Sequence, residues 1–186
     1  MILKVENKTK DFESYRAQRV KSLFNAEDGS QFKNEFNIEI DDMDWGIGLI
    51  VGSSGSGKTS IGKQFFGEDK MCNLYAGWEH DKPIVDCILP EGDFNTATGA
   101  LASVGLGDVP SWLRPFNALS NGQQFRAGLA RLVTEAPDEV VVDEFTSVID
   151  RQIAKVGALA FGKNWRRNKG KKVVLLSCHY DIIEWL

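Results

Sequence analysis

Residues 52–59 form a glycine- and serine-rich segment that ends in a lysine and a threonine, GSSGSGKT. An apolar run before it, Ile47 to Val51, is predicted to be a buried strand, and the run Ser60 to Phe66 after it is predicted to be a helix. Glycines let the backbone curl so that successive N–H groups point inward, and a helix N-terminus adds partial positive charge. A strand, such a loop and a helix in this order therefore predict a phosphate-binding site.

The spacing of this segment is that of a Walker A loop, in which the lysine reaches the β- and γ-phosphates and the next hydroxyl ligates Mg²⁺. Lys58 and Thr59 are predicted to have these two roles. The predicted nucleotide-binding residues are Gly52, Ser53, Ser54, Gly55, Ser56, Gly57, Lys58, Thr59 and Ser60. The sequence therefore predicts binding of a nucleoside triphosphate.

The composition limits the class of protein. With 186 residues, 42% of them hydrophobic and 26% charged, the chain is typical of one ordinary globular domain. A net charge of −4 argues against a general attraction of the whole molecule to nucleic acid. No apolar run approaches the roughly 18 residues that span a bilayer, so no direct membrane insertion is expected. The three cysteines form no CxxC pair, which favours reduced thiols and a cytoplasmic location.

A second motif, residues 140–144, is a Walker B pattern: three valines, then Asp143 and Glu144. A buried parallel strand is almost continuously apolar, and its carboxyl end is where an open α/β sheet presents its ligand. Asp143 is therefore predicted to hold Mg²⁺, directly or through water. Glu144 faces differently and is predicted to polarise the water that attacks the γ-phosphate.

A third segment, Leu119 to Gln123, reads LSNGQ and resembles the LSGGQ signature of ABC-type ATPases, with Asn121 in place of a glycine. It begins a helix predicted over Asn121 to about Glu135, for which Ser120 or Asn121 is a suitable N-cap. In that family this helix end contacts the γ-phosphate held by a second subunit. The resemblance therefore implies an ATP-dependent homodimer, with ATP bound between the subunits. Its implied signature residues are Ser120, Asn121, Gly122 and Gln123.

Two further segments occur in the order that this family requires. Ser147 to Asp150 resembles the D-loop, which implies a D-loop role for Asp150. His179 follows a predicted strand and resembles the H-loop histidine, which contacts the γ-phosphate; alone, this histidine would be as compatible with a structural role. Together the segments imply a Mg²⁺-dependent ATPase with Glu144 and His179 as catalytic residues.

The predicted fold class is α/β, a P-loop NTPase of ABC type with a mainly parallel sheet. Later elements are expected as a strand over Glu139 to Val142, a helix from Arg151 to about Asn168 and a strand over Val173 to Ser177. Residues 1–186 are interpreted as one domain, and we expect it to be C-terminally truncated, since it ends before the strand and helix that usually close an ABC fold.

Two other regions are assigned more coarsely. The β-like segments Phe12 to Asn25 and Phe32 to Ile40 predict an N-terminal antiparallel β portion. A helical region, Asn95 to Phe116, predicts a reduced helical subdomain over about 91–135.

Two expected family features are harder to place. No glutamine forms a clear Q-loop after the apolar run Ile84 to Leu89, which is predicted to be a strand; Glu91 and Asp93 are the polar candidates there. Candidates for the aromatic residue that stacks on adenine are Tyr15, Phe24 and Phe32. Adenine preference is thus implied by the family.

The segment between the phosphate loop, which begins at Gly52, and the signature, which begins at Leu119, is short for a transporter cassette. The sequences Gly105 to Leu113, Ser120 to Ala127 and Leu129 to Arg131 are similar to those of a non-transporter ABC group of prokaryotes and phages, whose members can be fused to a GNAT-type acetyltransferase domain. This resemblance favours a non-transport ATPase. The alternatives are the nucleotide-binding subunit of an ABC transporter and a nucleotide-sensing switch that scarcely turns over.

A basic stretch, Lys163 to Lys172, contains Trp165 and no acidic residue. Basic residues interleaved with an aromatic can bind nucleic acid. The same residues also suit a solvated helix C-terminus, where they complement the helix dipole, and we favour this second interpretation.

Overall fold

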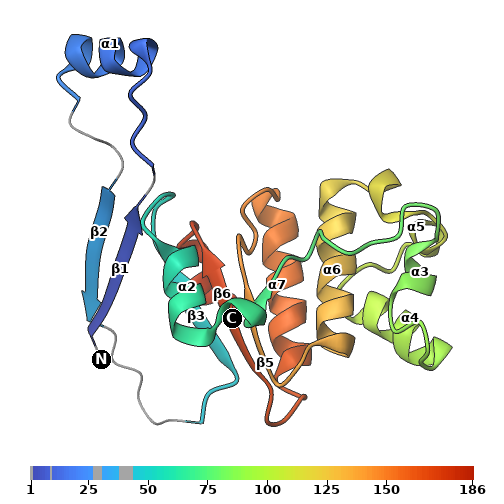
Figure 1. Ribbon diagram of the computed structural model, residues 1–186. Coiled ribbons are helices and arrows are strands. Elements are labelled where there is room, and N and C mark those ends of the chain that lie inside the picture. Colours follow the sequence, from blue (N-terminus) through green and yellow to red (C-terminus); the bar gives the residue numbers. More distant parts are fainter. Residues whose placement is uncertain (1, 9, 27–30, 38–43) are drawn as a thin grey trace. The chain divides into compact units, whose positions relative to one another are not determined.

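The computed structural model describes residues 2–8, 10–26, 31–37 and 44–186, and the chain divides into two compact units, Met1–Asp42 and Met43–Leu186. In the first unit β1 (Ile2–Lys8) pairs with β2 (Gln31–Asn37) in an antiparallel ladder, with Ile2 opposite Asn37 (Figure 1). An antiparallel N-terminal portion is therefore present as predicted, but its first strand is Ile2–Lys8 and not the predicted segment Phe12 to Asn25. Residues 38–40 of the segment predicted as a strand lie outside the described ranges.

The prediction of a β-like segment over Phe12 to Asn25 is wrong, because α1 (Tyr15–Phe24) occupies it. Ser14 caps this helix by accepting a hydrogen bond from the Ala17 N–H at 3.3 Å, and Asn25 ends it in the left-handed conformation with φ 45°. No residue of α1 is buried, so the apolar residues that suggested a strand do not serve a core face. Local capping therefore outweighed the β propensity of the segment.

The second unit contains a parallel sheet in the order β3-β6-β5-β4. Its strands are β3 (Ile47–Val51), β4 (Met71–Cys72), β5 (Glu139–Val142) and β6 (Lys172–Ser177). The three longer strands match their predictions to within one residue. β4 was missed, since two residues are too few to show an alternation or an apolar run.

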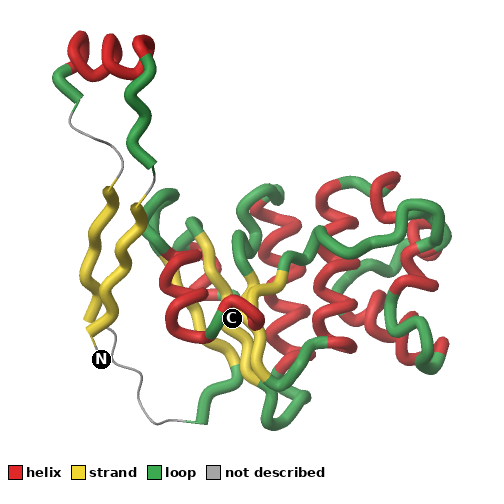
Figure 2. Tube along the Cα trace, in the orientation of Figure 1, coloured by secondary structure: helices red, strands yellow, loops and turns green. Residues whose placement is uncertain are grey.

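Helices cover both faces of this sheet, as Figures 1 and 2 show. The α-helices of this unit are α2 (Lys58–Phe66), α3 (Ile84–Cys87), α4 (Phe94–Ser103), α5 (Val109–Trp112), α6 (Asn121–Glu135) and α7 (Arg151–Trp165). Short 3₁₀ turns are η1 (Glu68–Lys70), η2 (Phe116–Ala118) and η3 (Asp181–Glu184). Phe66 of α2 packs with Val141 and Val174 on one face, while α6 and α7 contribute to the larger core on the other.

One predicted strand is instead a helical turn. The run Ile84 to Leu89 contains α3, and the Asp86 N–H donates to the Pro83 carbonyl at 3.0 Å. Ile84, the first residue of α3, and Ile88, which follows its last residue, are both buried. The apolar content of this run therefore serves a helical core contact, which a run of this length does not distinguish from a strand.

A row of buried aromatic side chains connects α6 and α7 to the sheet. Ring centroids lie 5.6 Å apart for Phe125 and Phe145, 6.1 Å for Phe145 and Phe161, and 5.4 Å for Phe161 and Trp165. The Trp165 indole N–H donates to the Gly46 carbonyl, 2.9 Å away, just before β3. This row fixes the turn after β5 against both long helices.

Gly128 of α6 is required by a close approach to the chain that leaves β4. A Cβ at this position would lie 2.8 Å from the Leu74 Cβ and 2.9 Å from the Leu74 carbonyl oxygen. Gly128→Ala is therefore expected to lower the free energy of unfolding by about 1–3 kcal/mol through overpacking. Gly99→Ala in α4 is the matched control, since its Cβ would meet nothing within 4 Å, and alanine there should be neutral or stabilise by about 0.5–1 kcal/mol. Urea unfolding of both variants measures this, and equal effects would contradict the steric argument.

Candidate nucleotide-binding site

The glycine-rich loop connects β3 to α2 and is built tightly. The Gly52 N–H donates to the Ser177 carbonyl at 3.2 Å, which extends the β3–β6 ladder into the loop. Gly55 and Gly57 have φ of 77° and 92°, a region that side chains rarely adopt. A Cβ on Gly52 would lie 2.8 Å from the Ser56 Oγ. The backbone conformation therefore favours glycine at 55 and 57, and the Ser56 side chain leaves little room for a Cβ at 52.

Lys58 lies at the first position of α2 and folds over the loop. Its Nζ donates to the carbonyl oxygens of Gly52 and Ser53, at 2.8 Å each. Ser53 and Ser54 are exposed, and Ser60 lies in the first turn of α2. The helix N-terminus and the lysine ammonium thus put positive charge around one loop, which suits a phosphate group.

The two predicted metal ligands are in direct contact. The Thr59 hydroxyl donates to the Asp143 Oδ2 at 2.9 Å, although the two residues are 84 positions apart. The Asp143 Oδ1 accepts from the Glu144 N–H at 2.9 Å, so both carboxylate oxygens are held in place. Hydroxyl and carboxylate oxygens are what Mg²⁺ prefers, so this pair fits the ion.

Glu144 sits on a tight turn after β5. It has φ 52°, and Thr146, buried at 1% exposure, has φ 64°. Phe145 between them is fully buried, and its N–H donates to the Leu176 carbonyl at 2.8 Å. Two left-handed non-glycine residues around a buried anchor are costly, and such strain is concentrated at functional sites. The turn leaves Glu144 exposed at the edge where Asp143 lies.

The predicted signature forms the start of α6. Ser120 and Gln123 make a capping box: the Gln123 N–H donates to the Ser120 Oγ at 3.4 Å, and the Ser120 N–H donates to the Gln123 Oε1 at 3.0 Å. Asn121 is exposed, and a Cβ on Gly122 would lie 3.0 Å from two carbons of Ile153. The segment therefore presents a rigid helix N-terminus packed closely against the start of α7.

The segments predicted as D-loop and H-loop flank the same region. The Asp150 Oδ1 caps α7 by accepting from the N–H groups of Gln152 at 2.9 Å and Ile153 at 3.4 Å. His179 is half-buried just beyond β6, and its N–H donates to the Ser177 Oγ at 3.1 Å. Because Val51 and Ser177 are paired in the parallel ladder, the chain leaves both strands at the same edge, toward the loop on one side and His179 on the other.

The position of β4 beside β5 adds Asn73 to the Q-loop candidates Glu91 and Asp93. β4 pairs with β5, Cys72 opposite Val142, and the Asp143 N–H donates to the Cys72 carbonyl at 3.3 Å. The residue that leaves β4 is Asn73, which directly follows the residue bonded to the backbone of the proposed metal ligand. Glu91 lies in a loop and Asp93 caps α4, both far along the chain from this strand. A polar residue after the apolar pair 71–72 was the only available signal.

Tyr75 belongs to the same segment. Its hydroxyl is buried and has no hydrogen-bond partner among the described residues. Burial, and secondarily the negative charge of Glu144, raise the pKa of Tyr75. The chain after β4 thus lies within electrostatic reach of the proposed catalytic carboxylate.

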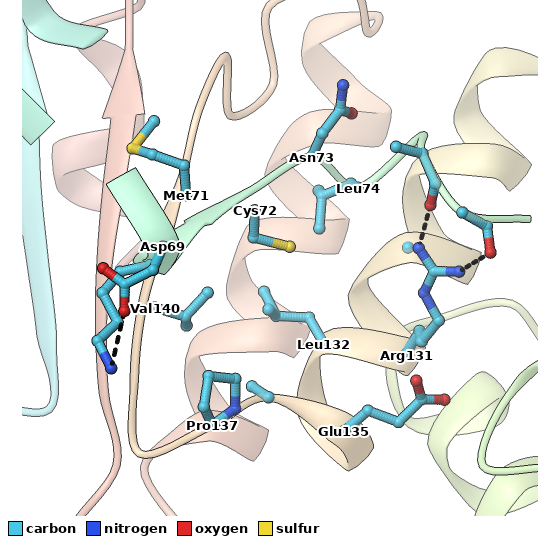
Figure 3. A pocket seen from close by; sticks show the side chains of 15 residues that line it. Asp69, Met71, Cys72, Asn73, Leu74, Arg131, Leu132, Glu135, Pro137 and Val140 are labelled. Atoms are coloured by element: carbon cyan, nitrogen blue, oxygen red, sulfur yellow. Dashed lines mark hydrogen bonds and ion pairs between the residues drawn. The ribbon is translucent and has the colours of Figure 1, made fainter. Parts of the chain in front are cut away.

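A cavity of about 490 Å³ lies on the other side of this segment, between β4 and the C-terminal half of α6 (Figure 3). Arg131 crosses it, donates to the carbonyls of Ala76 and, at 3.0 Å, Gly77, and lies 4.1 Å above the Trp78 ring. Burial raises the pKa of Cys72, which lines the cavity. The phosphate loop contributes no residue to the lining of this cavity, whereas Asn73 is among the residues that line it.

No protein-family model matches the chain. Curated proteins similar to it include the zinc import ATP-binding protein ZnuC of Jannaschia sp. (strain CCS1), 29% identical over 157 residues that cover 74% of this chain and 63% of that protein. The methionine import ATP-binding protein MetN 2 of Acinetobacter baylyi is 36% identical over 66 residues, which cover 36% of this chain and 19% of that protein. The chain thus spans less than two thirds of the length of either relative.

Solved structures are similar to this chain in fold. The ATP-binding cassette MJ0796, in a dimeric post-hydrolysis state bound to ADP and Pi, has a TM-score of 0.62 at 17% identity, with 100% of this chain and 91% of that chain covered. The fold is that of an ATP-binding cassette. A putative cobalt transport ATP-binding protein, cbiO-2, has a TM-score of 0.59 at 18% identity and covers 100% of this chain and 73% of its own. The predicted fold class is thereby confirmed.

In this fold the carboxyl ends of all four parallel strands lead into candidate site segments: β3 into the phosphate loop, β4 into Asn73, β5 into Asp143 and β6 toward His179. Within the described ranges, no helix is both long enough and apolar enough to cross a membrane. Tyr15 and Phe24 lie at the two ends of α1 and Phe32 lies in β2, so the choice of an adenine-stacking residue stays a prediction.

Proposed function

We propose that this chain is the catalytic domain of a cytoplasmic ABC-type ATPase that binds and hydrolyses ATP with Mg²⁺. The observation that carries the proposal is the 2.9 Å contact between Thr59 and Asp143, beside a loop over which Lys58 is folded. The proposal assigns residues 1–186 to one ATPase domain with a small helical subdomain over about 91–135. The relatives named above as ATP-binding proteins and cassettes support this assignment.

Each group has a role that its position supports. The loop N–H groups and Lys58 bind the β- and γ-phosphates, and Thr59 and Asp143 would hold Mg²⁺, which neutralises charge on the phosphates when bound. Glu144 orients the attacking water and accepts its proton, and His179 contacts the γ-phosphate. Asn73 is proposed to take the Q-loop place, since it leaves the strand that is bonded to Asp143.

The signature helix is proposed to complete the site of a second copy. One loop leaves the γ-phosphate open on one side, and two-fold symmetry would then give two equivalent sites, each with Ser120 and Asp150 from the other subunit. The similarity to MJ0796, solved as a dimer, supports this arrangement. ATP that binds the dimer better than the monomer must promote association.

We therefore expect Glu144→Gln protein to be a monomer without nucleotide and a dimer with Mg-ATP, as measured by light scattering. Adding Ser120→Arg should abolish the dimer, because the large arginine side chain would block the contact between the signature helix and the nucleotide bound by the other subunit. Ser103→Arg, at the end of α4, is the control and should leave association unchanged. A mass that ignores ATP, or an ATP-driven dimer indifferent to Ser120→Arg, would overturn the sandwich arrangement.

We propose that ATP hydrolysis drives a process other than transport. The support is that the segments around the signature resemble the non-transporter group in amino-acid sequence and that the helical region is short. We also propose a GNAT-type acetyltransferase domain as a partner of this ATPase, either associated with it or fused to it. The printed names of the relatives, which concern zinc and methionine import, favour a second candidate, the nucleotide-binding subunit of a transporter. Co-purification of the tagged chain with membrane subunits would support the second candidate, and recovery without them would support the first.

Nucleic-acid binding by the basic stretch receives less support. Lys171 donates to the Ala136 carbonyl at 2.5 Å, Lys172 lies 5.3 Å above the Trp45 ring, and Arg166 donates to the Leu186 carbonyl at 2.5 Å. Trp165 is fully buried and so is not available to stack on a base. These contacts favour a helix end that is tied to its own fold.

A further inference from the structure

We propose that Arg151 is a positioning residue for hydrolysis, which holds the turn carrying Glu144 and the segment carrying His179 in one fixed arrangement. The inference rests on the proposed ATPase function and goes beyond it, because Arg151 belongs to none of the nucleotide motifs.

The Arg151 guanidinium contacts both segments at once. Its Nε donates to the Asp181 Oδ2 at 3.0 Å and its Nη2 donates to the Asp181 Oδ1, which makes a two-pronged ion pair. The remaining nitrogen, Nη1, donates to the Thr146 carbonyl at 3.2 Å and to the Thr146 hydroxyl at 3.3 Å. The guanidinium also lies 5.0 Å from the centre of the Trp185 ring.

The two segments that it joins carry the proposed catalytic groups. Thr146 is two residues after Glu144, and both have positive φ, 64° and 52°. A β-branched residue in this conformation is costly and persists only where its surroundings hold it. Asp181 begins η3, two residues after His179. Arg151 itself directly follows Asp150, the last residue of the proposed D-loop.

The ion pair is too exposed to serve mainly as a source of stability. The side chains of Arg151 and Asp181 are 34% and 44% exposed, and pairs of this kind contribute about 0–1 kcal/mol to folding. The hydrogen bond from Arg151 is the main cause that lowers the pKa of Asp181. The planar guanidinium of arginine bonds the Asp181 carboxylate and the Thr146 turn at the same time, so it holds the two at a fixed separation and angle. The flexible ammonium of a lysine does this less well.

The test compares Arg151→Met, Arg151→Lys and Asp181→Asn, singly, with the double variant Arg151→Met/Asp181→Asn. We expect Arg151→Met to lower kcat for ATP at least about tenfold, since small misplacements of catalytic groups are costly, with KM changed less than about twofold. Asp181→Asn should lower kcat less, and the double variant should be no slower than Arg151→Met, because both substitutions break one connection. Arg151→Lys should retain the charge but lie between wild type and Arg151→Met.

Lys155→Met, on the exposed side of the same helix, is the control and should leave kcat unchanged. Thermal melting should differ little among the variants. An unchanged kcat in Arg151→Met, a loss of nucleotide affinity as large as the loss of kcat, or a strongly lowered melting temperature would each overturn the positioning role. Failure of the ATPase proposal is distinguishable, because wild-type protein would then show no hydrolysis.

Discussion

Glu144→Gln is expected to stop ATP hydrolysis while ATP and Mg²⁺ still bind. The amide keeps the size and shape of the side chain but is not a base, and catalytic bases contribute about 10²–10⁴-fold to rate. The turn itself should survive, since its anchor is the buried Phe145 and the Glu144 side chain is exposed. Single-turnover hydrolysis, with nucleotide affinity measured in parallel, gives the two quantities separately.

The control for this experiment is Glu139→Gln, the same change at the opposite end of β5, where the side chain is exposed. Its hydrolysis rate should equal that of wild type. Unchanged turnover in Glu144→Gln would move the catalytic base to another residue, and His179 would be the first to replace.

Lys58→Ala should reduce ATP affinity by about 100-fold or more. The lysine is the one side-chain cation of the loop 52–59, and charge-assisted hydrogen bonds to phosphate oxygens contribute about 1.5–3 kcal/mol each, with about 1.4 kcal/mol for each factor of ten. The chain should stay folded, because the ammonium is bonded to two carbonyls at the loop surface and does not pack in a core.

Calorimetric titration with ATP measures this effect, and Lys82→Ala provides the comparison. Lys82 is a surface lysine paired with Glu79 at 2.8 Å, so its removal should leave ATP affinity unchanged. An affinity within about threefold of wild type in Lys58→Ala would show that the loop does not bind the phosphates as proposed.

The parts of the structure that the sequence predicts well are those with local causes. The boundaries of α6 agree with the prediction because Ser120 caps it and Phe125, Leu129 and Leu132 repeat at helical spacing on a buried side. The strand at 139–142 is recognisable because a buried parallel strand leaves an unbroken apolar run.

The parts that the sequence did not predict depend on partners distant in the chain. The two residues of β4 form a strand only because Val141 and Val142 lie beside them. Likewise, Arg151 looks like an ordinary first-turn residue until the fold brings Asp181 to it, 30 positions away. The strand predicted over Ile84 to Leu89 is wrong for a different, local reason, because the apolar spacing of this short run fits a helical turn as well as a strand.

The contact between Thr59 and Asp143 has a consequence for how the metal would enter. A threonine hydroxyl and an aspartate carboxylate supply the oxygen ligands that Mg²⁺ prefers. The Thr59 Oγ1 and the Asp143 Oδ2 already lie 2.9 Å apart. A metal held by Thr59 and Asp143 would take the place of the hydrogen bond that joins the loop after β3 to the end of β5, so the same two elements would be connected with or without the metal.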